Sequence, residues 1–170
     1  MKTAALSLVC VALFAAGSMA RAASLNAVDK SFLRTAARID MTEAHKGQLA
    51  ANQASAADVK DFAKTLVQDE TLAWQHLSEL AAKTGASIPR GINASKDQEI
   101  MRLTSLKGDR FDRQFTREEI AAEQQAIAVF KREAAHGHDT DVKSYANSTL
   151  TALENDLQLA QKCAKAGKKS

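Results

Sequence analysis

The feature that most limits how this chain can fold is its small number of helix-breaking residues. Its 170 residues include 1 Pro and 7 Gly, and only 5% are aromatic. Apolar residues make up 45% of the chain and recur every three to four positions over four long stretches, the spacing of one face of an α-helix. A many-stranded protein would need more turn residues and more β-branched or aromatic residues. The sequence therefore predicts an all-α protein.

The apolar spacing predicts four long amphipathic helices and one short helix. The expected long helices cover residues 28–53, 55–84, 109–136 and 141–166, and the short one lies between residues 95 and 107. We expect Ser55, Ser95 and Asp109 to cap helix starts with their side chains. Gly47 lies on an apolar face, where its missing side chain allows a neighbouring helix to approach closely.

These helices predict an up-and-down four-helix bundle, with the short helix in the crossover between the second and third long helices. The loop over residues 85–94 contains the Pro and two Gly, and we expect it to cross the end of the bundle. We see no linker and no internal repeat that would divide the chain. The expected organisation is a single domain over residues 23–166 followed by a basic tail over residues 167–170.

The first residues predict a secretory signal peptide. Lys2 is followed by an uncharged, mostly apolar stretch over residues 4–17, and Ala20-Arg21-Ala22 places small residues at the two positions that a signal peptidase recognises. A membrane anchor is the alternative, but spanning a bilayer takes ~20 apolar residues. We therefore expect residues 1–22 to be removed and the protein to reside in the bacterial periplasm.

Cys163 is the only cysteine that remains after this cleavage, so the mature chain cannot form an internal disulfide. Its neighbours Lys162 and Lys165 would favour a reactive thiolate by lowering the thiol pKa. The alternative, which we favour, is a cysteine near the C-terminus with no special role.

Carboxylates on the apolar helix faces are the unusual feature of this sequence. Glu43, Glu70 and Glu123 lie on the apolar faces of three different helices, and Asp156 lies beside Leu153 on the fourth. A buried carboxylate has to be protonated, paired, hydrated or bound to a metal ion. Carboxylates that face one another across a helical bundle are how di-metal sites are built.

Two observations weaken the metal interpretation. The chain has four arginines that would pair with these acids at the edges of the apolar faces: Arg34, Arg38, Arg113 and Arg117. The Glu-x-x-His motif of di-iron bundles occurs once, as Glu133 to His136 at the end of a helix, where exposure to solvent explains it better.

Motifs spread over every long helix resemble one bacterial family. They are Phe32 to Ala50, Val59-Lys60-x-Phe62-Ala63-x-x-Leu66-Val67-x-Asp69, Gly108-x-x-Phe111-Asp112-Arg113-x-Phe115, Ala126-Ile127-x-x-Phe130 and Thr149-Leu150-x-x-Leu153-x-x-x-Leu157-x-x-Ala160-Gln161. Over residues 29–162 the chain resembles domain of unknown function 4142, a ferritin-like group of exported envelope proteins. The resemblance implies a ferritin-like bundle.

The resemblance also implies where polar groups of the bundle lie. The family usually has a Glu on its first helix, an Asp-His pair on its second, and one His on each of its third and fourth helices. This chain keeps Glu43 and Asp69 but has Glu70, Glu123 and Asp156 where the histidines are expected, and Thr151 replaces the usual Pro. An all-oxygen site favours hard divalent ions over copper, nickel or zinc. A relative that has lost an ancestral metal site is equally consistent with these replacements.

The sequence thus favours an exported, non-catalytic bundle that acts in envelope stress or binds an envelope protein. The alternative is a protein that binds a divalent metal ion (Mn, Ca or Fe) through Glu43, Glu70, Glu123 and Asp156. A membrane-surface role is weaker, because charges of both signs are mixed on every helix. A net charge of +3 does not indicate nucleic-acid binding. No residue pattern indicates a catalytic site, and the oligomeric state is left open.

Overall fold

Five α-helices make up almost all of the computed structural model, which describes residues 25–167. They are α1 (Ala27–Gln53), α2 (Ala57–Thr84), α3 (Ala94–Thr104), α4 (Gly108–His136) and α5 (Thr140–Ala166). The predicted all-α bundle with a short extra helix is therefore confirmed. The predicted signal peptide and nearly all of the basic tail lie outside the described residues. Within the described part of the chain, no helix combines the length and apolarity needed to cross a membrane.

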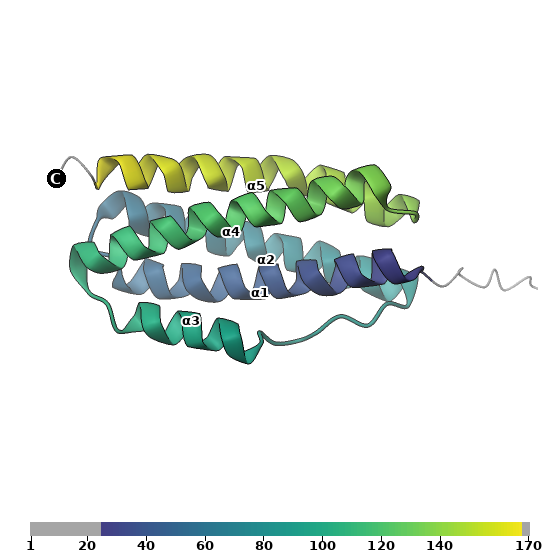
Figure 1. The fold of residues 1–170 in the computed structure, drawn as a ribbon, viewed down its shortest axis with the longest axis horizontal. Coiled ribbons are helices and arrows are strands. Elements are labelled where there is room, and N and C mark those ends of the chain that lie inside the picture. Colours follow the sequence, from purple (N-terminus) through teal and green to yellow (C-terminus); the bar gives the residue numbers. More distant parts are fainter. Residues whose placement is uncertain (1–24, 168–170) are drawn as a thin grey trace, which may run out of the picture.

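The bundle consists of two helical hairpins. Helix α1 packs along α2 and α4 packs along α5, and the two hairpins meet through α2 with α5 and α1 with α4. Contrary to our expectation, the connection over residues 85–107 does not cross the end of the bundle. It runs back along the bundle, with α3 on its outside, so that α4 begins at the end where α1 finishes (Figure 1). Leu103 anchors α3, since its side chain is only 1% exposed.

The starts of the helices differ from the sequence prediction at three positions. Ser55 does not cap α2, because its N–H and its hydroxyl both donate to the carboxylate of Asp112 on α4. Helix α3 is capped by the side chain of Asn93 instead of Ser95. No side chain caps α4, so the predicted role of Asp109 is also wrong. At the start of α2, the carboxylate of Asp112, which is distant in the sequence, therefore takes the place of the local side-chain cap that was expected.

The two hairpins are related by a weak internal repeat that the sequence analysis missed. Residues 58–63 run Asp-Val-Lys-x-Phe-Ala, and residues 141–146 run Asp-Val-Lys-x-Tyr-Ala. The separation of 83 residues also relates Asp29 to Asp112 and Phe32 to Phe115. The pattern is hard to recognise without the structure, because few of the other equivalent positions are identical.

Each hairpin closes the turn of the other. The carboxylate of Asp29 on α1 accepts hydrogen bonds from the N–H groups of His138 and Asp139, both at 3.0 Å. Asp112 accepts in the equivalent way from the N–H groups of Ser55, at 3.0 Å, and Ala56, at 2.8 Å. These two contacts at opposite ends set how far α1 and α4 are shifted along each other.

Two apolar clusters fill the bundle. The first contains Phe32, Leu33, Ala36, Ala37, Leu77, Leu80, Ala126, Phe130, Val142, Tyr145, Ala146 and Leu153, together with Leu25. The second contains Ala50, Ala54, Val59, Phe62, Ala63, Leu66, Leu103, Phe111, Phe115, Ala160 and Cys163. The prediction for Gly47 is confirmed, because a Cβ atom there would lie 2.9 Å from a methyl carbon of Val67 on α2.

Candidate metal centre

A layer of charged side chains separates the two apolar clusters. Each long helix contributes to the first cluster, then to the layer, then to the second cluster, or passes through them in the reverse order. The layer, called the carboxylate layer below, contains Asp40, Glu43 and Lys46 from α1, Glu70 from α2, Glu119 and Glu123 from α4, and Asp156 from α5. All seven side chains are buried, so water does little to solvate their charges.

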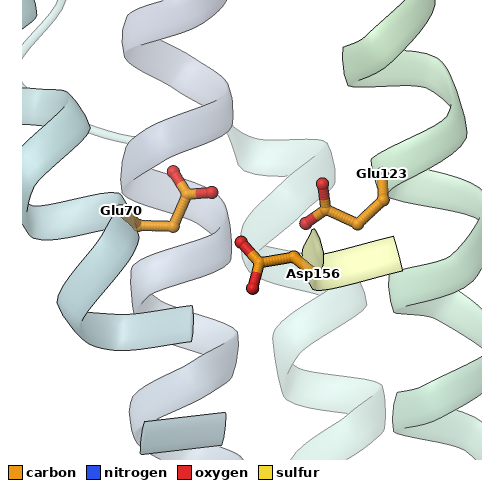
Figure 2. Close-up of side chains that lie close together, drawn as sticks. All are labelled: Glu70, Glu123 and Asp156. Atoms are coloured by element: carbon orange, nitrogen blue, oxygen red, sulfur yellow. The ribbon is translucent and has the colours of Figure 1, made fainter. Parts of the chain in front are cut away.

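Three of these carboxylates converge from three different helices. One oxygen each from Glu70, Glu123 and Asp156 lies within 4.8 Å of the others, and Figure 2 shows the three groups pointing toward a common space. These residues are 3%, 1% and 1% exposed. Neither oxygen of Glu123 and neither oxygen of Asp156 has a hydrogen-bond partner. On the sides of Glu123 and Asp156, the space between the three groups is therefore lined by oxygen atoms that no other part of the protein satisfies.

Lys46 neutralises another part of the layer. Its Nζ atom lies 2.5 Å from Oε1 of Glu119 on α4 and 3.2 Å from Oε2 of Glu43 on its own helix. Burial acts to lower the pKa of Lys46, but the two carboxylates outweigh that effect and raise the pKa above its usual range. Lys46 is the only buried basic side chain among residues 25–167, so one fixed positive charge faces six carboxyl groups.

Burial and the proximity of like charges oppose the ionisation of most carboxyl groups in the layer. Burial raises the pKa of Glu123 to about 9 and that of Asp40 to about 8. It raises the pKa of Asp156 to about 7, with help from the charge of nearby Asp69. Burial and the neighbouring Asp40 and Glu123 also hold the pKa of Glu70 well above its usual range.

The pKa of Glu119 is raised as well, although Lys46 lies against it. Its complete burial and the charge of Glu43 outweigh the ammonium group. Without bound cations, the layer is therefore stable only with several of its acids protonated.

The four acids singled out from the sequence have different neighbours in the structure. The structure brings Glu70, Glu123 and Asp156 together, while Glu43 pairs with Lys46. Glu43 still lies near enough to raise the pKa of both Glu70 and Glu123. It therefore adjoins both parts of the layer.

The expected arginine partners do not reach the layer. Arg34, Arg38, Arg113 and Arg117 are all exposed at the surface. Lys46, three residues after Glu43, pairs with that carboxylate in their place. The Glu-x-x-His motif was expected to be exposed to solvent. His136 is exposed, but Glu133 is buried and lies away from the layer.

Asp40, Lys46 and Glu119 belong to the layer but were not among the site residues predicted from the sequence. Asp40 lies four residues after Ala36 and three before Glu43, which places it on the same helix face. It is also 83 residues before Glu123, its equivalent in the internal repeat. Either observation would have identified it.

Cys163 does not have the character of a reactive thiol. It is buried in the second apolar cluster, and its sulfur donates to the carbonyl oxygen of Asp58 at 3.5 Å. Burial raises its pKa to about 11, whereas Lys162 lowers it only partly. The less favoured interpretation, in which flanking lysines activate this thiol, is therefore wrong, because the side chain points into the bundle and not toward the solvent around those lysines.

The carboxylate layer has the chemistry of a site for a hard cation. Its donors are carboxylate oxygens, and its seven members include no imidazole, thiolate or thioether. Oxygen donors suit Mn²⁺, Ca²⁺ and Fe²⁺, whereas Cu⁺ prefers sulfur. The unsatisfied oxygens of Glu123 and Asp156 fit such an ion, since coordination would replace the missing hydrogen bonds.

The sequence profile of one family covers almost the whole chain. The family is described as a domain of unknown function (DUF4142), and its profile matches residues 14–163. A search of curated proteins gives no match.

Several solved structures share the fold at low sequence identity. A DUF305 fragment from Deinococcus radiodurans is 12% identical with a TM-score of 0.75, covering 85% of this chain and 99% of the fragment. CopM in its Cu(I)-bound form is 12% identical with a TM-score of 0.68, covering 81% of this chain and 96% of CopM. A dodecameric thioferritin, the bacterioferritin-related protein from Bacteroides fragilis, is 16% identical with a TM-score of 0.63, covering 84% and 86%. These similarities show a ferritin-like bundle.

Proposed function

Because this chain belongs to the DUF4142 family and has a ferritin-like fold, we propose that it binds a divalent metal ion at the centre of its bundle. The proposed ligands are Glu70, Glu123 and Asp156, with Glu43 adjoining them. The observation that carries the proposal is the convergence of three buried carboxylates, two of which have no hydrogen-bond partner for either oxygen. A divalent ion would remove their mutual repulsion and satisfy those oxygens together.

The donor set points to a hard ion. We propose Mn²⁺, Ca²⁺ or Fe²⁺, with Mn²⁺ as the ion for the first test. CopM is described in Cu(I)-bound and Cu(II)-bound forms and has a similar fold. The carboxylate layer of this chain lacks the soft donors that Cu⁺ prefers, so we propose that the layer does not select Cu⁺.

Adding Mn²⁺ to the metal-free protein is expected to raise its melting temperature. An ion present at 100 times its dissociation constant stabilises the folded state by about 2.7 kcal/mol, which for a domain of this size corresponds to roughly 10 °C. Glu123→Gln keeps the size of the side chain but removes a ligand charge, and it should abolish most of this shift. The measurement is thermal unfolding at pH 8 after treatment with EDTA, with and without Mn²⁺, Ca²⁺ or Fe²⁺ under anaerobic conditions.

Glu79→Gln is the matched control, because Glu79 lies on α2 like Glu70 but is exposed. It should retain the full Mn²⁺-dependent shift, whereas Glu70→Gln should lose it. If no divalent ion shifts the melting temperature of the parent, the carboxylate layer is a protonated polar core and the metal proposal is wrong.

We also propose that the protein acts in the periplasm, in keeping with the signal-peptide pattern over residues 1–22. Expression of the full chain in a bacterium should give a periplasmic protein whose first residue is Ala23. N-terminal sequencing of the periplasmic fraction tests this, and an intact Met1 recovered with the inner membrane would contradict it. Binding to an envelope protein stays a prediction from the sequence.

A further inference from the structure

We infer that this bundle holds a single metal ion, because the ammonium group of Lys46 occupies the place of a second cation. The inference rests on the proposed function and deepens it. It assigns Glu70, Glu123 and Asp156 to the ion and assigns Glu43 and Glu119 to Lys46.

The carboxylate layer has two parts that differ in how their charge is neutralised. In the first part, Nζ of Lys46 lies between carboxylates on two helices, 3.2 Å from Glu43 and 2.5 Å from Glu119. In the second part, Glu70, Glu123 and Asp156 have oxygens within 4.8 Å of one another and no basic side chain among them. The first part is therefore filled by a cation that the chain itself supplies, and the second lacks one.

The two parts adjoin each other within the bundle. Glu119 and Glu123 are one helical turn apart on α4, so their carboxylates follow one another along the same face. Oε2 of Glu43 lies 3.2 Å from Nζ of Lys46, so Glu43 belongs with Glu119 to the part of the layer that holds the ammonium group.

Lys46 also cannot easily leave this position. Its side chain is 3% exposed, so a second ion would have to displace a buried ammonium group from two carboxylates. Breaking a buried ion pair in this way is strongly unfavourable. Removing the side chain genetically is different, because it leaves Glu43 and Glu119 facing the space that Cγ, Cδ, Cε and Nζ had filled.

The experiment is to count bound Mn²⁺ by equilibrium dialysis and elemental analysis of the full mature protein. The parent is expected to bind one ion per chain, and Lys46→Ala is expected to bind two. Lys46→Met removes the charge but keeps the space filled, so it should still bind one. In Lys46→Ala, electron paramagnetic resonance should change from the spectrum of an isolated Mn²⁺ to that of two interacting ions. Adding Glu119→Gln to Lys46→Ala should restore a single ion.

The outcomes separate this inference from the proposed function. A parent that binds no Mn²⁺ contradicts the proposed function itself. A parent that binds two ions, or a folded Lys46→Ala variant that binds only one, contradicts the role of Lys46 but leaves metal binding intact. Circular dichroism checks that each variant is helical. If Lys46→Ala does not fold, the number of Mn²⁺ ions bound per parent chain still tests the inference. One ion supports it, and two ions overturn it.

Discussion

The metal-free protein is expected to lose several kcal/mol of stability between pH 5 and pH 8. Burial raises the pKa of Glu123 from 4.5 to about 9, and that of Asp40 from 3.8 to about 8. Between the unfolded and folded pKa values, the folded state holds a proton that the unfolded chain has released. Stability from these groups is therefore full below about pH 4 and is lost as the pH rises toward their folded pKa values.

The size of the loss follows from the same shift. A group that is protonated only in the folded state costs about 1.4 kcal/mol per pH unit, so Glu123 alone accounts for about 4 kcal/mol over three units. Urea unfolding in EDTA at pH 5, 6, 7 and 8 measures it. Glu123→Gln should give a shallower dependence by about 1.4 kcal/mol per unit, because it removes one titrating group.

Mn²⁺ should reverse this trend. The ion competes with protons for the carboxylates, so its stabilising effect is expected to increase from pH 5 to pH 8. A metal-free protein whose stability is constant or increases over this range would show that the acids of the carboxylate layer ionise normally, and the layer would then have to be hydrated.

Asp112→Ala is expected to destabilise the protein by about 3 kcal/mol, since hydrogen bonds to charged groups are worth about 1.5–3 kcal/mol each and three donors at the turn lose their partner. Its carboxylate accepts from the N–H of Ser55 at 3.0 Å, from the hydroxyl of Ser55 at 2.5 Å, and from the N–H of Ala56 at 2.8 Å. The substitution opens the turn between α1 and α2 and removes one of the two contacts that align the hairpins. Urea unfolding at a single pH measures the loss.

Asp109→Ala is the matched control on the same first turn of α4. The side chain of Asp109 is 82% exposed and makes only a 3.8 Å ion pair with Arg113, so its removal should change stability by less than about 0.5 kcal/mol. Asp29→Ala removes the equivalent contact at the other end of the bundle and should resemble Asp112→Ala. A change below about 0.5 kcal/mol for Asp112→Ala would show that water replaces the carboxylate at this turn.

The face of each helix could be predicted from the sequence, because 3.6-residue periodicity is a local property of the chain. Phe32, Leu66 and Phe130 belong to the apolar residues that recur with this periodicity, and all three are buried. The same reasoning identified Glu43, Glu70, Glu123 and Asp156 as acids on those faces, and all four are buried. A carboxylate spaced three or four residues from apolar side chains lies on the same helix face as they do, independently of the tertiary structure.

Side chains at the edges of those faces were harder to predict. Lys46 on α1 is buried, while Arg34 and Arg38 on the same helix are exposed. A residue at the edge of a helix face is buried only if a neighbouring helix covers it. The residues next to it in the sequence do not determine where that neighbouring helix lies. The pairing of Lys46 with Glu119, which is 73 residues away in the chain, depends on that packing.

Only the tertiary structure decided which acids meet. Glu70, Glu123 and Asp156 lie on three helices, so their distances depend on how those helices are shifted along one another. That shift is set at the turns, where Asp29 and Asp112 each bind backbone N–H groups of the opposite hairpin. Local periodicity determined that these acids face inward, whereas contacts between residues more than 50 positions apart brought them within 4.8 Å of one another.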